Sequence, residues 1–185
     1  FILAVYFSTN GVSAMITGFN ATYHLTDNRT WIELQLLSFI LTLILAILLI
    51  LTITFQILSL DFMNYLVVED YLKQYSADLI LYAKWLILII VLFISISILY
   101  YYGPAEKSRW NFFSIGSMSA TILSVITSIG FSYYINNFSQ YNQLYGSIGT
   151  LLVILLWMYF NSIILLLGFE LNVIIVSAKN KKNEN

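Results

Sequence analysis

Four long apolar stretches dominate the pattern of hydrophobic and polar positions along the chain. They cover about residues 36–58, 84–102, 112–138 and 148–177, and Glu170 is the one charge inside them apart from the boundary residue Lys84. A helix of roughly 20 residues crosses a hydrocarbon core of about 30 Å. Isolated strands would leave backbone groups unpaired in lipid. The pattern therefore predicts four membrane-spanning helices.

Residues 1–19 form a weaker fifth candidate span. They are apolar overall but are diluted by Ser8, Thr9, Asn10, Gly11, Ser13 and Thr17. The chain opens inside an apolar run, with no initiator Met and no charged leader before it. We interpret this stretch as the remainder of a span whose start is missing, and the sequence as a piece of a longer chain.

The composition agrees with a membrane protein. Hydrophobic residues make up 60% of the 185 positions and charged residues 9%, whereas soluble domains carry about 25% charged residues. The absence of cysteine excludes a disulfide framework, an iron–sulfur site and a thiol nucleophile. The formal charge of −1 gives no reason to expect nucleic acid as a partner. The predicted fold is an all-α, polytopic transmembrane helix bundle, with residues 1–185 as one domain and membrane lipids as its partners.

The distribution of cations predicts the orientation. If the spans alternate, one side receives six cations, namely Arg29, Lys107, Arg109, Lys179, Lys181 and Lys182. The other side receives two, Lys73 and Lys84. The positive-inside rule makes the first side cytoplasmic. We therefore expect a multi-pass protein of a bacterial plasma (inner) membrane, with residues 178–185 as a cytoplasmic tail.

The connection at residues 59–83 is too polar to span a membrane. Its apolar residues Met63, Leu66, Val67, Tyr71 and Tyr75 recur at helical spacing, with polar residues on the opposite side. This pattern favours an amphipathic helix lying at the outer interface. A solvated cap over the bundle is the alternative.

Several motifs, taken in order, resemble those of the YihY/BrkB family of bacterial inner-membrane proteins. They are Ser8–Gly11, Gly18–Tyr23, Tyr102–Pro104, Trp110, Gly116–Thr121, Phe131–Tyr134, Tyr141–Asn142, Tyr145–Gly149, Trp157 and Leu167–Asn172. One departure is Ala105, where the family usually has Asn after the proline. The resemblance implies six spans with both termini cytoplasmic, the first span and most of the second being absent here. The resemblance does not imply one particular activity. The family has carried the label ribonuclease BN, some members are linked to virulence, and others are suspected of moving lipids or other solutes.

Glu170 is the most informative polar residue inside a predicted span. A carboxylate in lipid costs at least about 2–3 kcal/mol, so we expect it to face the bundle interior or a wet cavity. It lies two residues before Asn172 and two after Gly168. A role in proton or substrate coupling and a structural hydrogen bond to a neighbouring helix are both open.

The remaining candidates for a substrate pathway are polar residues near or within spans. Small residues recur at spacings of four from Gly116 to Ser132, which suits close helix packing or a polar lining. The candidates are Ser124 and Ser128 on this stripe, Asn142 and Tyr145 in the following link, and Asn20 and Tyr23 at the predicted cytoplasmic end of the first segment. Helix packing, a turn and interfacial anchoring are the respective structural alternatives.

These observations favour transport or flipping of a lipid or other amphiphile. A non-transporting membrane scaffold for an envelope-synthesis partner is the alternative. An enzyme is not predicted, since the chain has one histidine and lacks HExxH, GxSxG and P-loop motifs, and no cofactor or metal is expected. The small-residue faces also allow a homodimer, although intramolecular packing uses the same surfaces.

The orientation generates the first prediction. In intact cells, an amine reagent that does not cross the membrane should leave Lys179, Lys181 and Lys182 unmodified, and lysed cells should show them modified. Mass spectrometry of the C-terminal peptide measures the difference. Modification of these lysines in intact cells would contradict the predicted topology.

Overall fold

The computed structural model describes residues 1–22, 27–68, 74–105, 111–137 and 147–183. Within these ranges the chain is helical and contains no strand, which confirms the all-α prediction. The helices are α1 (Ile2–Thr22), α2 (Trp31–Val68), α3 (Gln74–Tyr102), α4 (Ile115–Asn137) and α6 (Ser147–Asn183).

Each helix contains a stretch that is long and apolar enough to cross a membrane. The stretches are Ile2–Thr22, Trp31–Ser59, Tyr82–Tyr102, Ile115–Asn136 and Gly149–Lys179. They match the five predicted spans within a few residues at most ends. The first segment is a full helix of 21 residues in spite of its polar positions, because helices tolerate such residues when they pack against neighbouring helices.

The connection at residues 59–83 differs from the prediction of a separate interfacial helix. Its first part prolongs α2 as far as Val68, and its last part belongs to α3 from Gln74 onward. The described parts of this stretch are therefore helical, as continuations of α2 and α3. The apolar spans end at Ser59 and begin at Tyr82, close to the predicted residues 58 and 84, whereas the helices themselves continue into more polar sequence.

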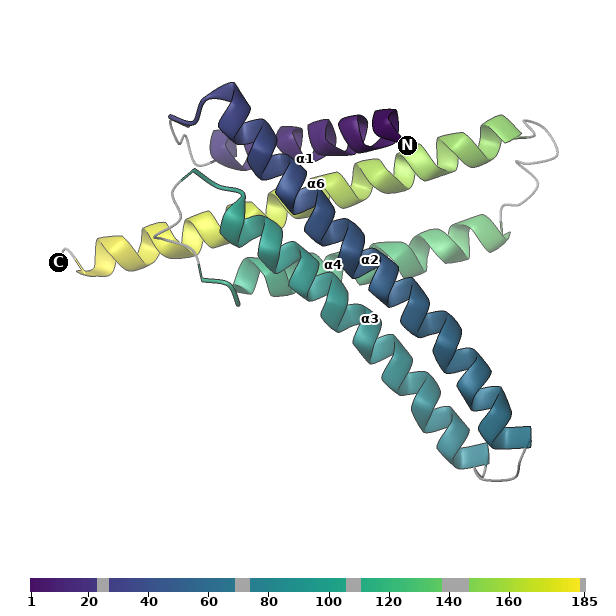
Figure 1. The fold of residues 1–185 in the computed structure, drawn as a ribbon. Coiled ribbons are helices and arrows are strands. Elements are labelled where there is room, and N and C mark those ends of the chain that lie inside the picture. The colour runs from purple at the N-terminus through teal and green to yellow at the C-terminus, as the bar shows by residue number, and fades with distance from the viewer. Residues whose placement is uncertain (23–26, 69–73, 106–110, 138–146, 184–185) are drawn as a thin grey trace.

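The helices form two arms that share one end (Figure 1). α2 and α3 make a long antiparallel hairpin, and α4 packs against α6 along the second arm. α1 packs against both α2 and α6. The end of α1, the start of α2, the end of α3, the start of α4 and the C-terminal half of α6 meet on the side where the C terminus lies (Figure 1). We call this side the C-terminal end of the bundle.

The core lies near this shared end and receives residues from all five helices. Its centre is a cluster of three buried rings from α1, α3 and α6. Phe19 stacks on Phe169 with ring centroids 4.7 Å apart. Tyr100 meets Phe19 and Phe169 edge-on at 5.4 and 5.6 Å. The hydroxyl of Tyr100 donates to the carbonyl of Leu165 at 2.6 Å, so the buried phenol is hydrogen-bonded.

Two glycines let α4, α6 and Tyr100 approach one another closely. A methyl group at Gly168 would lie 2.5 Å from the Tyr100 hydroxyl and 2.6 Å from Cβ of Ala120. One at Gly116 would overlap the Gly168 carbonyl oxygen. The absence of side chains at these two positions is therefore what allows the α4–α6 contact.

This contact predicts a stability difference between two chemically identical substitutions. Gly168→Ala should destabilise the protein by about 1–3 kcal/mol, because the added methyl on α6 would push both Tyr100 and α4 away from α6. Gly130→Ala, on the same helix pair but with nothing within 4 Å of the added Cβ, should be neutral or stabilise by up to about 1 kcal/mol through helix propensity. Thermal unfolding in detergent measures both. Equal effects would show that the close approach does not control stability.

Candidate functional site

Asn20 lies at the centre of a polar network at the C-terminal end of the bundle. Its side chain on α1 is 4% exposed. Its Oδ1 accepts the backbone N–H of Ala105 at 2.9 Å, and its Nδ2 donates to Oδ2 of Asp27 at 2.7 Å. This candidate thus joins the end of α1 to Asp27, which precedes α2, and to Ala105, which follows α3.

An ion pair extends the network. Arg29 donates from Nε and Nη2 to the two oxygens of Asp27, both at 2.7 Å, and Nη2 also donates to the Gly103 carbonyl at 3.0 Å. The hydrogen bonds from Arg29 hold the pKa of the Asp27 carboxyl below its usual value. The sequence did not predict this ion pair, because Arg29 was used there only as one of the cations that indicate the orientation of the protein in the membrane.

Asn172 caps the start of α4. It is 6% exposed on α6, its Oδ1 accepts the backbone N–H of Gly116 at 2.8 Å, and its Nδ2 donates to Oγ of Ser114 at 2.9 Å. Ser114 in turn accepts the N–H of Ser117 at 3.1 Å, as an N-cap residue does. Asn172 therefore satisfies a backbone donor that the helix itself leaves without a partner.

The small-residue stripe on α4 divides into two parts. Ser117, Ala120, Thr121 and Ser124 are buried, and the Thr121 hydroxyl bonds the Ser117 carbonyl of its own helix at 2.7 Å. This part of the stripe serves close packing. Ser128 and Ser132 lie further along α4, where they line a groove instead.

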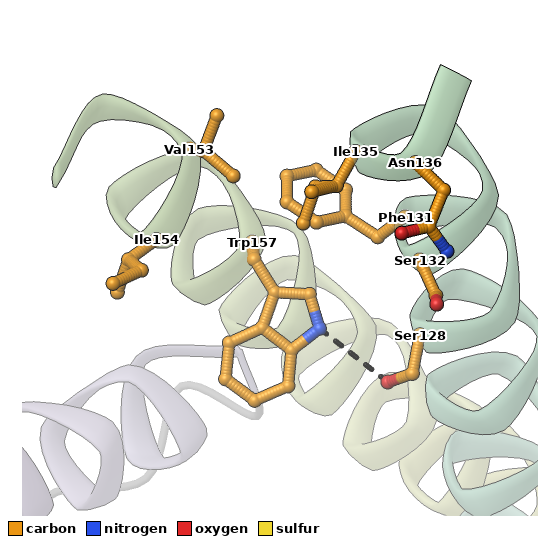
Figure 2. A pocket seen from close by; sticks show the side chains of 8 residues that line it. All are labelled: Ser128, Phe131, Ser132, Ile135, Asn136, Val153, Ile154 and Trp157. Carbon is orange, nitrogen blue, oxygen red and sulfur yellow. Dashed lines mark hydrogen bonds between the residues drawn. The ribbon is translucent and has the colours of Figure 1, made fainter. Parts of the chain in front are cut away.

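The groove between α4 and α6 has a volume of about 270 Å³. Its lining is Ser128, Phe131, Ser132, Ile135, Asn136, Val153, Ile154 and Trp157. Trp157 extends from α6 toward α4, where its indole Nε1 donates to the Ser128 hydroxyl at 3.4 Å (Figure 2). The groove thus combines apolar side chains with hydroxyl and amide groups.

Glu170 does not face the bundle interior, which was one of the two environments predicted for it. Its side chain is exposed on the surface of α6. The buried neighbours Gly168, Phe169 and Asn172 occupy the face that packs on the other helices, and at 3.6 residues per turn position 170 falls on the other side. The structure therefore separates Glu170 from Asn172, which the sequence had grouped together.

Three other predicted candidates, Tyr23, Asn142 and Tyr145, lie outside the described residues. Within the described ranges, no group of three or more acidic, histidine or cysteine side chains is placed to hold a metal ion. Sequence reasoning noted Lys84 only as a cation at a span boundary and did not predict its burial, since the residue is 6% exposed.

The architecture defines a polytopic α-helical membrane protein with a polar network at one end and an amphiphilic groove at the other. The chain belongs to the BrkB family: the family model described as "Virulence factor BrkB" matches residues 1–185.

The relatives carry names of two kinds. The ribonuclease-like protein YfkH of Bacillus subtilis is 29% identical over 186 residues, which cover all of this chain and 67% of YfkH. A UPF0761 membrane protein of Alteromonas mediterranea is 33% identical over 93 residues, or 50% of this chain and 32% of that protein. One from Xanthomonas campestris is 34% identical over 79 residues, or 43% and 19%. No solved structure matches significantly.

The ion pair predicts how stability depends on pH. Folding lowers the pKa of Asp27 below the ordinary value of 3.8. The ionised carboxylate therefore contributes its stabilisation of the folded state above about pH 4, and this stabilisation is lost as the pH falls further. Asp27→Asn should therefore destabilise the protein at pH 6, by about 1 kcal/mol for a partly exposed pair. The difference from the parent should shrink toward pH 3. Thermal unfolding at both pH values measures this, and a difference independent of pH would exclude the ionised pair as its source.

Proposed function

We propose that this protein moves a lipid or another amphiphile within or across the bacterial plasma membrane, with its C-terminal end cytoplasmic. The observation that carries the proposal is the α4–α6 groove. Its apolar walls suit hydrocarbon, whereas Ser128, Ser132 and Asn136 offer hydrogen bonds to a polar group. Because spans are surrounded by lipid, such a molecule can enter from the side.

The packing between α4 and α6 supports a path that is open at one end. From Ser128 to Asn136 the contact between α4 and α6 opens into the groove. From Gly116 to Ser124 the same contact is closed, because small buried residues pack there. An amphiphile in the groove therefore reaches the C-terminal end only by leaving this contact or after the helices separate. Rearrangement of packed units around a central site is the usual principle of secondary transporters.

The scaffold alternative has its own supporting observation. Glu170 is exposed on α6, next to Leu171 and one turn from Leu166 and Leu167, which are also exposed. A carboxylate facing lipid costs about 2.5–3.5 kcal/mol at the centre of a span. Contact with another polypeptide would relieve this cost.

Blocking the groove tests the transport proposal. Ser132→Phe should fill the groove and lower the transfer of labelled phospholipids between leaflets of reconstituted vesicles by about tenfold, equivalent to about 1.4 kcal/mol in the barrier. Ser162→Phe is the matched control, because Ser162 is exposed on α6 away from the groove.

Four outcomes test transport, the groove as its path, and the scaffold alternative. Parent transfer rates equal to those of empty vesicles, across several headgroups and both directions of a proton gradient, would overturn transport. Equal losses in both serine variants would exclude the groove as the path. If Glu170→Gln loses lipid transfer while its stability is unchanged, Glu170 takes part in transport. If this variant keeps lipid transfer but no longer forms a complex with another polypeptide, the scaffold function is favoured.

A further inference from the structure

The α4–α6 groove lies in a part of the chain that carries no charge. None of its eight lining residues is charged, and the sequence contains no Asp, Glu, Lys, Arg or His between Arg109 and Glu170. Glu170 itself stands on α6 more than three helical turns beyond Trp157. The groove therefore offers no opposite charge to an ion that enters it.

Neutral hydrogen-bonding groups follow one face of α4 instead. Ser128, Ser132 and Asn136 recur every four residues, so they form a row about 12 Å long at 1.5 Å per residue. All three line the groove, and Figure 2 shows them on the same side of α4. The row begins at Asn136, where the α4 span ends, and it leads inward along the span to Ser128.

This row has hydrogen-bonding capacity to offer a ligand. Ser128 accepts the indole N–H of Trp157 at 3.4 Å, which leaves its own O–H as a donor. Ser132 and Asn136 are exposed, and within the described residues neither side chain makes a hydrogen bond. The hydroxyl of Ser162, by contrast, donates to the Met158 carbonyl of its own helix at 2.9 Å. Lipid chains cannot supply the missing partners, whereas a polar headgroup in the groove can.

The absence of charge decides which headgroups the row favours. A charged group that leaves water loses far more hydration energy than a hydroxyl does, and only an opposite charge or several good hydrogen bonds offset this loss. A headgroup with several hydroxyls can exchange its bonds with water for bonds to the row, because serine and asparagine side chains both donate and accept. A zwitterionic headgroup carries its own counterion and falls between these two cases.

We propose that the α4–α6 groove selects amphiphiles whose headgroup is uncharged and carries several hydroxyl groups, as in a glycosyl diacylglycerol, over amphiphiles with an anionic phosphate. Ser132 and Asn136 are the residues that contact this headgroup. The inference rests on the proposed function, because it takes the groove as the place where the amphiphile binds.

Fluorescence quenching of Trp157 measures this selection without any transport. A protein in which Trp31, Trp85 and Trp110 are replaced by Phe keeps a single tryptophan, which lines the groove. It is reconstituted in phosphatidylcholine that contains increasing fractions of a second lipid with brominated chains. Monoglucosyl diacylglycerol and phosphatidylglycerol, both with the same brominated chains, are compared as the second lipid.

Selection for an uncharged headgroup predicts different quenching curves for the two lipids. Half-maximal quenching by the glucosyl lipid should occur at a fraction about tenfold below that for phosphatidylglycerol, because the anion loses hydration and gains no counterion. Ser132→Lys should reverse the preference, since it adds an ammonium group to the row. Ser162→Lys adds the same charge to α6 outside the groove and should keep the preference of the parent.

The comparison of the two lipids needs no substitution in the groove, so it tests the inference even if Ser132→Lys does not fold. Equal half-maximal fractions in the parent, or a preference for phosphatidylglycerol, would overturn the selection. An unchanged preference in folded Ser132→Lys would overturn the assignment of Ser132 to the headgroup site.

Transfer assays with the same two lipids distinguish this inference from the proposed function. Transfer of both lipids between leaflets at equal rates would overturn the selection and leave transport standing. A preference of the groove for the glucosyl lipid, in a protein that transfers neither lipid, would overturn transport and leave the selection standing.

Discussion

The close contact of Tyr100, Phe169 and Phe19 around Gly168 is the interaction on which the rest of the structure depends. Between helices in lipid there is little hydrophobic driving force, because lipid tails are as apolar as leucine. Shape and hydrogen bonds must therefore determine which helices meet. Gly168 leaves space for the Tyr100 hydroxyl, which bonds the Leu165 carbonyl at 2.6 Å. One tyrosine thereby ties α3 to α6, and Phe19 adds α1.

Hydrogen bonds near this contact hold the turns in place. Asn20 and Arg29 connect the region between α1 and α2 to the backbone after α3, and Asn172 connects α6 to the start of α4. These bonds give partners to backbone N–H and C=O groups at the ends of helices, and lipid chains cannot supply such partners. The C-terminal end of the bundle is consequently cross-linked by polar groups, whereas the two arms extend away from it (Figure 1).

Much of the fold could be predicted from the sequence, because hydropathy and length determine spans almost independently of tertiary contacts. All five spans and the helical class were found in this way. Helix ends could not be predicted in the same way where a helix continues into polar residues, as α2 does beyond the end of its span at Ser59. Asn20 and Ser128 were found as polar residues near spans, and both have structural partners.

Other features needed the three-dimensional structure. The direction of Glu170 depends on which face of α6 packs, and that is decided by Gly168 and Phe169 meeting residues from distant helices. Arg29 and Asp27 are two residues apart in sequence, but their importance comes from Gly103, 74 residues further along. The α4–α6 groove has no sequence signature, since its lining comes from two helices that are separate in sequence.

The small residues of α4 show why a motif alone does not reveal its function. Ala120 and Ser128 belong to one stripe with one periodicity, yet Ala120 is fully buried and Ser128 lines a groove. The difference arises because α6 presents Gly168 opposite the first and Trp157 opposite the second. The glycine leaves room for α4 to pack closely at Ala120, whereas the indole of Trp157 reaches the Ser128 hydroxyl and lines the groove beside it. The stripe therefore serves packing and lining at once, and the side chain on the facing helix decides which role each position takes.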